Sequence, residues 1–106
     1  MITAEFYLKE EQLCGVSIRG HAGYAEYGSD IVCASVTSAV ELTANAITEI
    51  LGVNALVGTY ENEVRVMLPS ESDRPDAVQF LKALRLHLAL LSEDYPENLR
   101  VTDVEV

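Results

Sequence analysis

The chain has 106 residues, of which 49% are apolar and 23% charged, with only 6 Gly and 3 Pro. This is enough for one domain with a modest core, and it excludes a disordered, collagen-like or low-complexity protein. Seven Lys and Arg stand against 17 Asp and Glu, and no Lys or Arg lies between Gly20 and Val64. This charge argues against direct nucleic-acid binding and favours a basic partner.

The absence of targeting signals and the small number of cysteines indicate where in the cell the protein acts. The first residues lack the basic start and apolar core of a secretory signal, and no stretch reaches the ~18 apolar residues of a membrane span. Two cysteines, Cys14 and Cys33, are too few for a disulfide scaffold. We therefore expect one domain over residues 1–106 that is cytoplasmic and does not contact a membrane.

The N-terminal residues predict a β-hairpin. Residues 2–9 alternate between apolar and polar, residues 10–12 form a polar turn, and residues 13–19 alternate again. In this register Cys14 faces the core as an ordinary strand residue. The apolar residues of the first strand share one face: Ile2, Ala4, Phe6 and Leu8.

A glycine-rich loop and a helix follow. Residues 20–29 hold three glycines and show no periodicity, which predicts a loop. Ser29 or Asp30 then provides an N-cap for a helix over residues 31–51, which Gly52 ends. Residues at spacings of three and four define its buried stripe: Val32, Val36, Val40, Thr43, Ile47 and Ile50.

The second half predicts strands over residues 54–60 and 63–69, a helix over 75–92 and a last strand over 98–106. Glu61 and Asn62 form the turn between the first two of these strands. The phase of the last strand shifts near Thr102 and Asp103, which suggests a bulge. The order ββαββαβ predicts an α+β two-layer sandwich, with two helices on one face of a mostly antiparallel sheet.

The helix over residues 75–92 is more apolar than one sheet face requires. The additional apolar residues indicate either a dimer contact or a helix that lies deep in a small core. The expected buried stripe comprises Ala77, Phe80, Leu81, Leu84, Leu88 and Leu91, and the excess comprises Val78, Leu86 and Leu90.

Cys33 is the candidate nucleophile. With Asp30 as N-cap it occupies N3, where free N–H groups and the helix dipole favour a thiolate. A dipole effect of ~1 kcal/mol lowers the pKa of a thiol by roughly 0.7 unit from ~8.5, so a second group is needed. His21 is the local candidate, because an imidazolium can pair with the thiolate and later protonate a leaving amine. The alternative is a buried cysteine and a solvated histidine.

The remaining polar candidates have structural interpretations. Asp30 either caps the helix or orients the imidazole as a third group. His87 is interpreted as a structural or surface residue. The set Cys14, Cys33, His21 and His87 lacks the paired close spacing of a zinc site, so we expect no metal and no cofactor.

Three short motifs resemble the ribosomal-processing cysteine protease Prp family, and the likeness covers essentially the whole chain. They are Gly20-His21-Ala22, Tyr27-Gly28 and Asp30-Ile31-Val32-Cys33-Ala34. The resemblance implies a small cytoplasmic homodimer that removes a short N-terminal extension from a large-subunit ribosomal protein. The extension would be cut after an apolar segment that ends in aromatic residues.

The resemblance also implies site roles. The catalytic cysteine falls on Cys33 and the catalytic histidine on His21, with Gly20 and Asp30 in supporting positions. Thr37 stands where the family often has a serine.

Loop mobility and an apolar groove complete the expected peptide site. The loop glycines would let the segment move and admit an extended peptide: Gly20, Gly23 and Gly28. Three residues are candidates for the groove: Tyr24, Tyr27 and Val36. Two other functions remain open, namely a non-catalytic ribosome-assembly or binding module with an acidic surface, and a hydrolase of small amides or thioesters.

Overall fold

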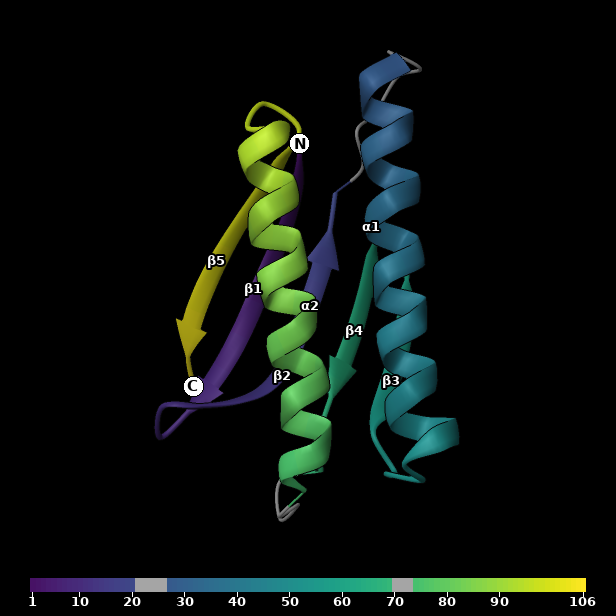
Figure 1. The fold of residues 1–106 in the computed structure, drawn as a ribbon, viewed down its shortest axis with the longest axis vertical. Coiled ribbons are helices and arrows are strands. Elements are labelled where there is room, and N and C mark those ends of the chain that lie inside the picture. The colour runs from purple at the N-terminus through teal and green to yellow at the C-terminus, as the bar shows by residue number, and fades with distance from the viewer. Residues whose placement is uncertain (21–26, 70–73) are drawn as a thin grey trace.

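A computed structural model describes residues 1–20, 27–69 and 74–106, with only the backbone described for residues 27–30. Its elements follow the predicted ββαββαβ order (Figure 1). They are β1 (Ile2–Lys9), β2 (Gln12–Arg19), α1 (Tyr27–Asn45), the π-helical turn η1 (Ala46–Ile50), β3 (Leu56–Tyr60), β4 (Glu63–Met67), α2 (Pro75–Asp94) and β5 (Leu99–Glu105).

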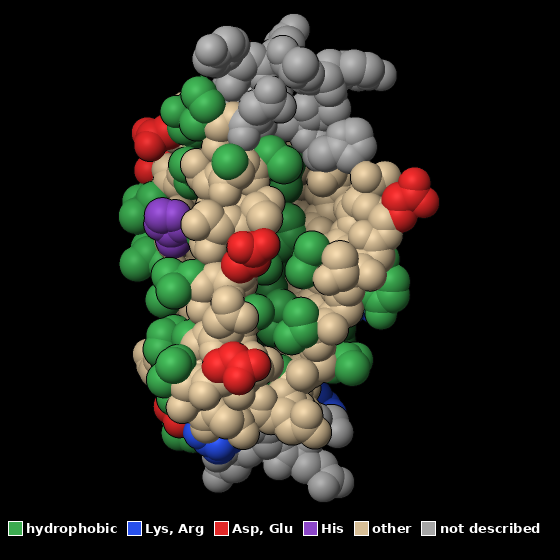
Figure 2. Space-filling model, turned by 90° about the vertical axis from the view of Figure 1, so that its right-hand side faces the viewer, with side chains coloured by type: hydrophobic (Ala, Val, Ile, Leu, Met, Phe, Trp, Pro, Cys, Tyr) green, Lys and Arg blue, Asp and Glu red, His purple; other side chains and the backbone are tan. Residues whose placement is uncertain are grey.

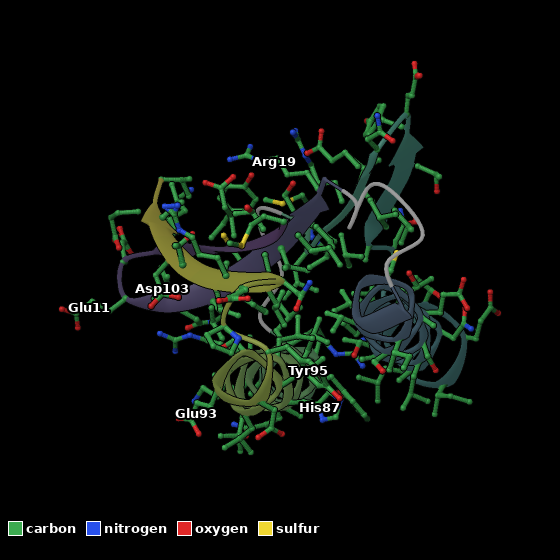
Figure 3. The ribbon with its side chains drawn as sticks, turned by 90° about the horizontal axis from the view of Figure 1, so that it is seen from above. Glu11, Arg19, His87, Glu93, Tyr95 and Asp103 are labelled. Carbon is green, nitrogen blue, oxygen red and sulfur yellow. The ribbon has the colours of Figure 1, made fainter. Side chains whose placement is uncertain are left out.

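The five strands form one sheet in the order β3-β4-β2-β1-β5. All neighbouring pairs are antiparallel except β1 and β5, which run parallel. Both helices cover the same face of the sheet, as the view along the helices shows (Figure 3). The predicted two-layer α+β sandwich is therefore confirmed.

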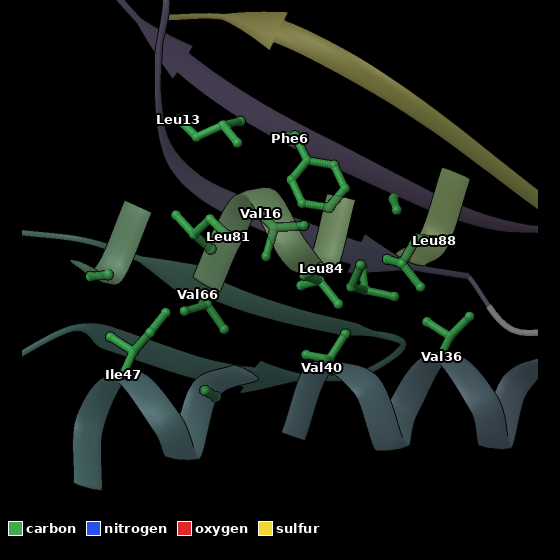
Figure 4. Close-up of a cluster of buried hydrophobic side chains, with 14 of the residues drawn as sticks. Phe6, Leu13, Val16, Val36, Val40, Ile47, Val66, Leu81, Leu84 and Leu88 are labelled. Carbon is green, nitrogen blue, oxygen red and sulfur yellow. The ribbon is translucent and has the colours of Figure 1, made fainter. Parts of the chain in front are cut away.

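The core lies between the helices and the central strands (Figure 4). Phe6 of β1 and Val16 of β2 are fully buried, and they face the fully buried Leu81 and Leu88 of α2. Val36 supplies the corresponding contact from α1. Burial of each such side chain stabilises the fold by ~1.5–3 kcal/mol, so these residues fix the helices over the sheet.

The bulge lies in the first hairpin instead of the last strand. Tyr7 pairs with Gly15 but Leu8 pairs with Leu13, so Cys14 is the extra residue. The shift turns Leu13 into the core and leaves Cys14 half-buried, which corrects the prediction of a core-facing Cys14. The register of β5 against β1 is continuous through Thr102 and Asp103, and the bulge predicted there is wrong.

The first helix starts earlier than predicted and ends in a π turn. It begins at Tyr27, and its final residues widen into η1, where the N–H of Leu51 donates to the Ala46 carbonyl at 2.9 Å. The wider turn rotates Ile50 off the buried stripe, leaving it 79% exposed. Gly52 then ends the helical segment as predicted, with a φ of +67°.

The second helix begins at Pro75 as predicted and ends two residues late, at Asp94. Its orientation differs slightly from the predicted stripe, because Val78 is buried while Phe80 is 38% exposed. Leu86 and Leu90 are 62% and 53% exposed. Of the apolar excess of this helix, Val78 therefore belongs to the core, whereas Leu86 and Leu90 lie on the outer surface.

Among the described residues, Ile31–Ile50 has the length and composition of a membrane span, with a mean hydropathy of 1.4. This corrects the expectation that no such stretch exists. The same segment carries the buried stripe of α1, including Val32, Val36 and Ile47. A core helix passes the same test, so the composition alone does not indicate a membrane protein.

Candidate active site

Cys33 lies at a cavity of about 190 Å³ at one end of the sheet. The cavity is bounded by α1, by the end of β2 and by the turn between β3 and β4. Thr37 lines it from the next turn of α1, Gly20 from the end of β2, and Asn62 from the hairpin turn. Cys33 is partly buried against the core. Cys33 therefore lies at a cavity that a ligand could enter.

The position of Cys33 within α1 differs from the prediction. Because the helix begins at Tyr27, Cys33 is its seventh residue and Asp30 its fourth. Asp30 is therefore not the N-cap, and the N–H of Cys33 is not among the first four free donors of the helix. The dipole effect fades beyond the first turn, so activation of the thiol depends more heavily on another group.

Gly20 has a defined structural role at the cavity rim. Its φ is +80°, and a Cβ at this position would lie 2.6 Å from the Met1 carbonyl oxygen. Its N–H donates to the carbonyl of Asn62 at 3.0 Å. Glycine is therefore required here for both conformation and space, and the bond to the hairpin fixes its position at the end of β2.

Two other predicted site residues, His21 and Gly23, lie outside the described residues. Their roles stay predictions, as does an orienting contact from Asp30 to His21. Gly28 was expected in the loop, but its backbone belongs to α1. Of the proposed groove residues, Val36 does line the cavity, whereas Tyr24 and the side chain of Tyr27 are not described.

Glu63 brings a fixed negative charge to the same cavity. The buried hydroxyl of Ser17 donates to its Oε2 at 2.6 Å, and the Arg65 guanidinium donates to the same oxygen at 2.9 Å. The bond from Ser17, and then that from Arg65, holds the pKa of Glu63 below its usual value. Glu63 is therefore ionised at neutral pH and links the hairpin to β2.

Because the folded pKa of Glu63 is lowered, its contribution to stability is present at neutral pH and is lost as the pH falls through that pKa. We expect Glu63→Gln to destabilise the protein near about pH 6 and to have a smaller effect near about pH 3. Urea unfolding at both pH values measures this.

The matched control for this comparison is Glu61→Gln, in the exposed turn of the same hairpin. It should leave the pH dependence of unfolding unchanged. A Glu63→Gln effect that is equal at both pH values would contradict the role assigned to the ionised carboxylate.

The other candidate ligands and nucleophiles lie elsewhere. Cys14 lines a second cavity near Met67, and His87 lines a groove between α1 and α2 (Figure 3). The Cys14 thiol donates to the Tyr7 carbonyl at 3.4 Å, and burial raises its pKa. Three different cavities are thus lined by Cys14, Cys33 and His87. Among the described residues, no cluster of side chains could hold a metal ion.

The sequence did not predict that the β3–β4 hairpin forms one side of the cavity. The strands and turn around Asn62 and Glu63 were predicted, but alternation of residues says nothing about which helix a hairpin approaches. The sheet order decides this, since β4 pairs with β2 and brings the turn beside Gly20.

Comparison with known proteins gives a consistent result. The family model for cysteine protease Prp matches residues 1–100. The chain is 31% identical over 99 residues to the ribosomal processing cysteine protease Prp of Bacillus subtilis, covering 88% of each chain. It is 29% identical over 103 residues to the protein of the same name from Staphylococcus aureus, covering 95% of this chain and 97% of the other.

Solved structures agree with the fold. SMU.848 from Streptococcus mutans matches with a TM-score of 0.84 at 27% identity, covering 100% of this chain and 96% of the other. The S. aureus Prp protease in complex with a covalently linked product peptide matches with a TM-score of 0.87 at 25% identity, covering 98% and 100%. The chain therefore belongs to the cysteine protease Prp family and is a cysteine peptidase, not the non-catalytic binding module that the sequence left open.

Proposed function

We propose that this peptidase removes the N-terminal extension of a large-subunit ribosomal protein with Cys33 as nucleophile and His21 as its partner. The thiolate attacks the scissile carbonyl, and the imidazolium of His21 protonates the leaving amine. Water then hydrolyses the thioester and frees Cys33. The observation that carries the proposal is that Cys33 lies at a cavity whose rim, Gly20, directly precedes His21.

The charge distribution supports a basic substrate. Residues 20–64 hold no Lys or Arg, and they supply most of the surface around the cavity. On the face shown in Figure 2, acidic side chains are spread among hydrophobic ones, and basic side chains are confined to its lower end. A large-subunit ribosomal protein is basic, so this surface attracts it. Both thiols are free, in keeping with a site of action in the reducing cytoplasm.

Mass spectrometry of the ribosomal protein after incubation with the enzyme tests the proposal. The wild type should remove the extension, and Cys33→Ala should leave the mass unchanged. The matched control is Cys14→Ala, which should cleave like the wild type, since Cys14 lies at a different hollow. Normal cleavage by Cys33→Ala would overturn the assignment. Hydrolysis of small acyl substrates alone would redirect it to amide or thioester chemistry.

We also propose that the enzyme is a homodimer through the outer surface of its helices. A groove of about 560 Å³ runs between α1 and α2, and Leu42 and Phe80 line it. Leu42 is 73% exposed, and Leu86 and Leu90 on the outer surface of α2 are 62% and 53% exposed. Exposed large apolar side chains beside an apolar groove are typical of a protein–protein contact.

Sedimentation tests the dimer. The wild type is expected to sediment as a dimer of the 11.6-kDa chain, and Leu42→Asp together with Leu90→Asp as a monomer. Both side chains are exposed, so the charges should not unfold the monomer. A wild type that stays monomeric would contradict the proposal.

A further inference from the structure

β3 is an edge strand with an unprotected edge. Among the residues that the structure describes it pairs only with β4, and Leu56, Val57 and Tyr60 are 68%, 45% and 56% exposed. Natural proteins shield such edges with charged side chains, proline or a bulge, because a bare edge pairs with other chains. The sequence of β3 contains no charge and no proline, and its register with β4 is unbroken.

The opposite edge of the sheet is different. β5 carries Arg100, Asp103 and Glu105, and the carboxylate of Asp103 is paired with Arg85 of α2. One edge is therefore shielded by charge while the other is open. The open edge of β3 is thus a specific feature and not a general property of this sheet.

The hairpin determines which groups of β3 are free. Tyr60 pairs with Glu63 across a two-residue turn, so these two residues exchange both hydrogen bonds. The same pattern recurs at every second residue and directs the N–H and C=O groups of Val57 and Thr59 away from β4. The open edge therefore offers two donors and two acceptors, in two sets about 7 Å apart along the strand.

This edge is continuous with the cavity at Cys33. Tyr60, the last residue of β3, is one of the residues that line the cavity. β3 runs alongside α1, and hydrophobic side chains fill the strip between the helical layer and the sheet (Figures 1 and 2). An extended chain that reaches Cys33 can therefore continue along β3.

We propose that the apolar extension of the peptide substrate pairs with the free edge of β3 as a sixth strand while its scissile bond lies at Cys33. The inference rests on the proposed function and names the recognition element of that site. An uncharged strand selects an uncharged occupant, because a charge brought there would be desolvated without a partner. Continuity with the cavity identifies the occupant as substrate and not as a second copy of the chain. Backbone pairing supplies affinity, and alternate side chains supply specificity.

A backbone scan of the substrate tests the pairing. The probe is a synthetic peptide that spans the extension and the first mature residues, bound to the Cys33→Ala enzyme so that it stays intact. Each amide of the extension is N-methylated in turn. We expect Kd to rise about tenfold at alternate positions, where a hydrogen bond to β3 is lost. The intervening positions serve as matched controls and should bind like the parent peptide. Equal sensitivity at all positions, or none, would overturn the proposal.

Hydrogen exchange locates the pairing on the enzyme. Binding of the probe should slow exchange of the Val57 and Thr59 amides, while the β3 amides already bonded to β4 change little. Protection that appears without peptide and grows with enzyme concentration would assign the edge to a second copy and overturn the inference. These readouts use the inactive enzyme, so they are independent of whether the wild type cleaves the ribosomal protein.

Discussion

Replacement of His21 by alanine is expected to lower kcat/KM for the extension peptide by about 10³-fold, since general acid–base groups contribute 10²–10⁴-fold. Cys33 lies beyond the first turn of α1, and no Lys or Arg occurs between Gly20 and Val64. The helix and its neighbours therefore offer little other help to the thiolate. His21 is accordingly expected to carry both the activation of the sulfur and the protonation of the leaving amine.

Alkylation kinetics separate these two tasks of His21. In a Cys14→Ala background, iodoacetamide should modify Cys33 much faster than an ordinary thiol, and His21→Ala should remove that advantage. A rate profile that is unchanged by His21→Ala would show that the imidazole does not maintain the thiolate. In that case the dyad would have to be abandoned.

Gly20→Ala is expected to have the second-largest effect. The added Cβ would meet the Met1 carbonyl oxygen at 2.6 Å, and the φ of +80° is strained for alanine. We expect a loss of about 1–3 kcal/mol in the free energy of unfolding. Because Gly20 directly precedes His21 in the chain, a displacement of about 1 Å at Gly20 should also lower kcat/KM by about 10²-fold.

Gly52→Ala is the matched control for that variant. Gly52 has a similar φ of +67°, but nothing lies within 4 Å of the position its Cβ would take. It should lose a comparable part of its stability from strain alone while keeping full activity. Urea unfolding and peptide kinetics on the two variants measure this. If both lost activity equally, strain and not the placement of His21 would explain the effect of Gly20→Ala.

Most of the fold could be predicted from local pattern. Alternation gave β1 and the hairpin turns, and Pro75 and Gly52 marked helix ends correctly. Two errors in the predicted buried faces arose where an extra residue interrupts the regular spacing of a strand or helix. The bulge at Cys14 turned Leu13 instead of Cys14 into the core, and the π turn moved Ile50 to the surface. Hydrophobic spacing does not reveal such insertions, because tertiary packing decides them.

The site was predictable only in part. The motifs around Gly20 and Cys33 identified the two elements that meet at the cavity, because both lie close together in the sequence. The hairpin residues Asn62 and Glu63 enter from about thirty residues away through the sheet order. The start of α1 was also misplaced, because Asp30 has the identity of an N-cap but lies inside the helix.

The parallel pairing of β5 with β1 has a consequence for folding kinetics. Ile2 pairs with Leu99 and Leu8 with Glu105, so these strands join parts of the chain that are far apart in sequence. Leu99 is 2% exposed, so the core is complete only when β5 is in place. Contacts between such distant residues form slowly, because the intervening chain must first lose conformational freedom. The pairing of β5 with β1 is therefore expected to form late, after the antiparallel hairpins.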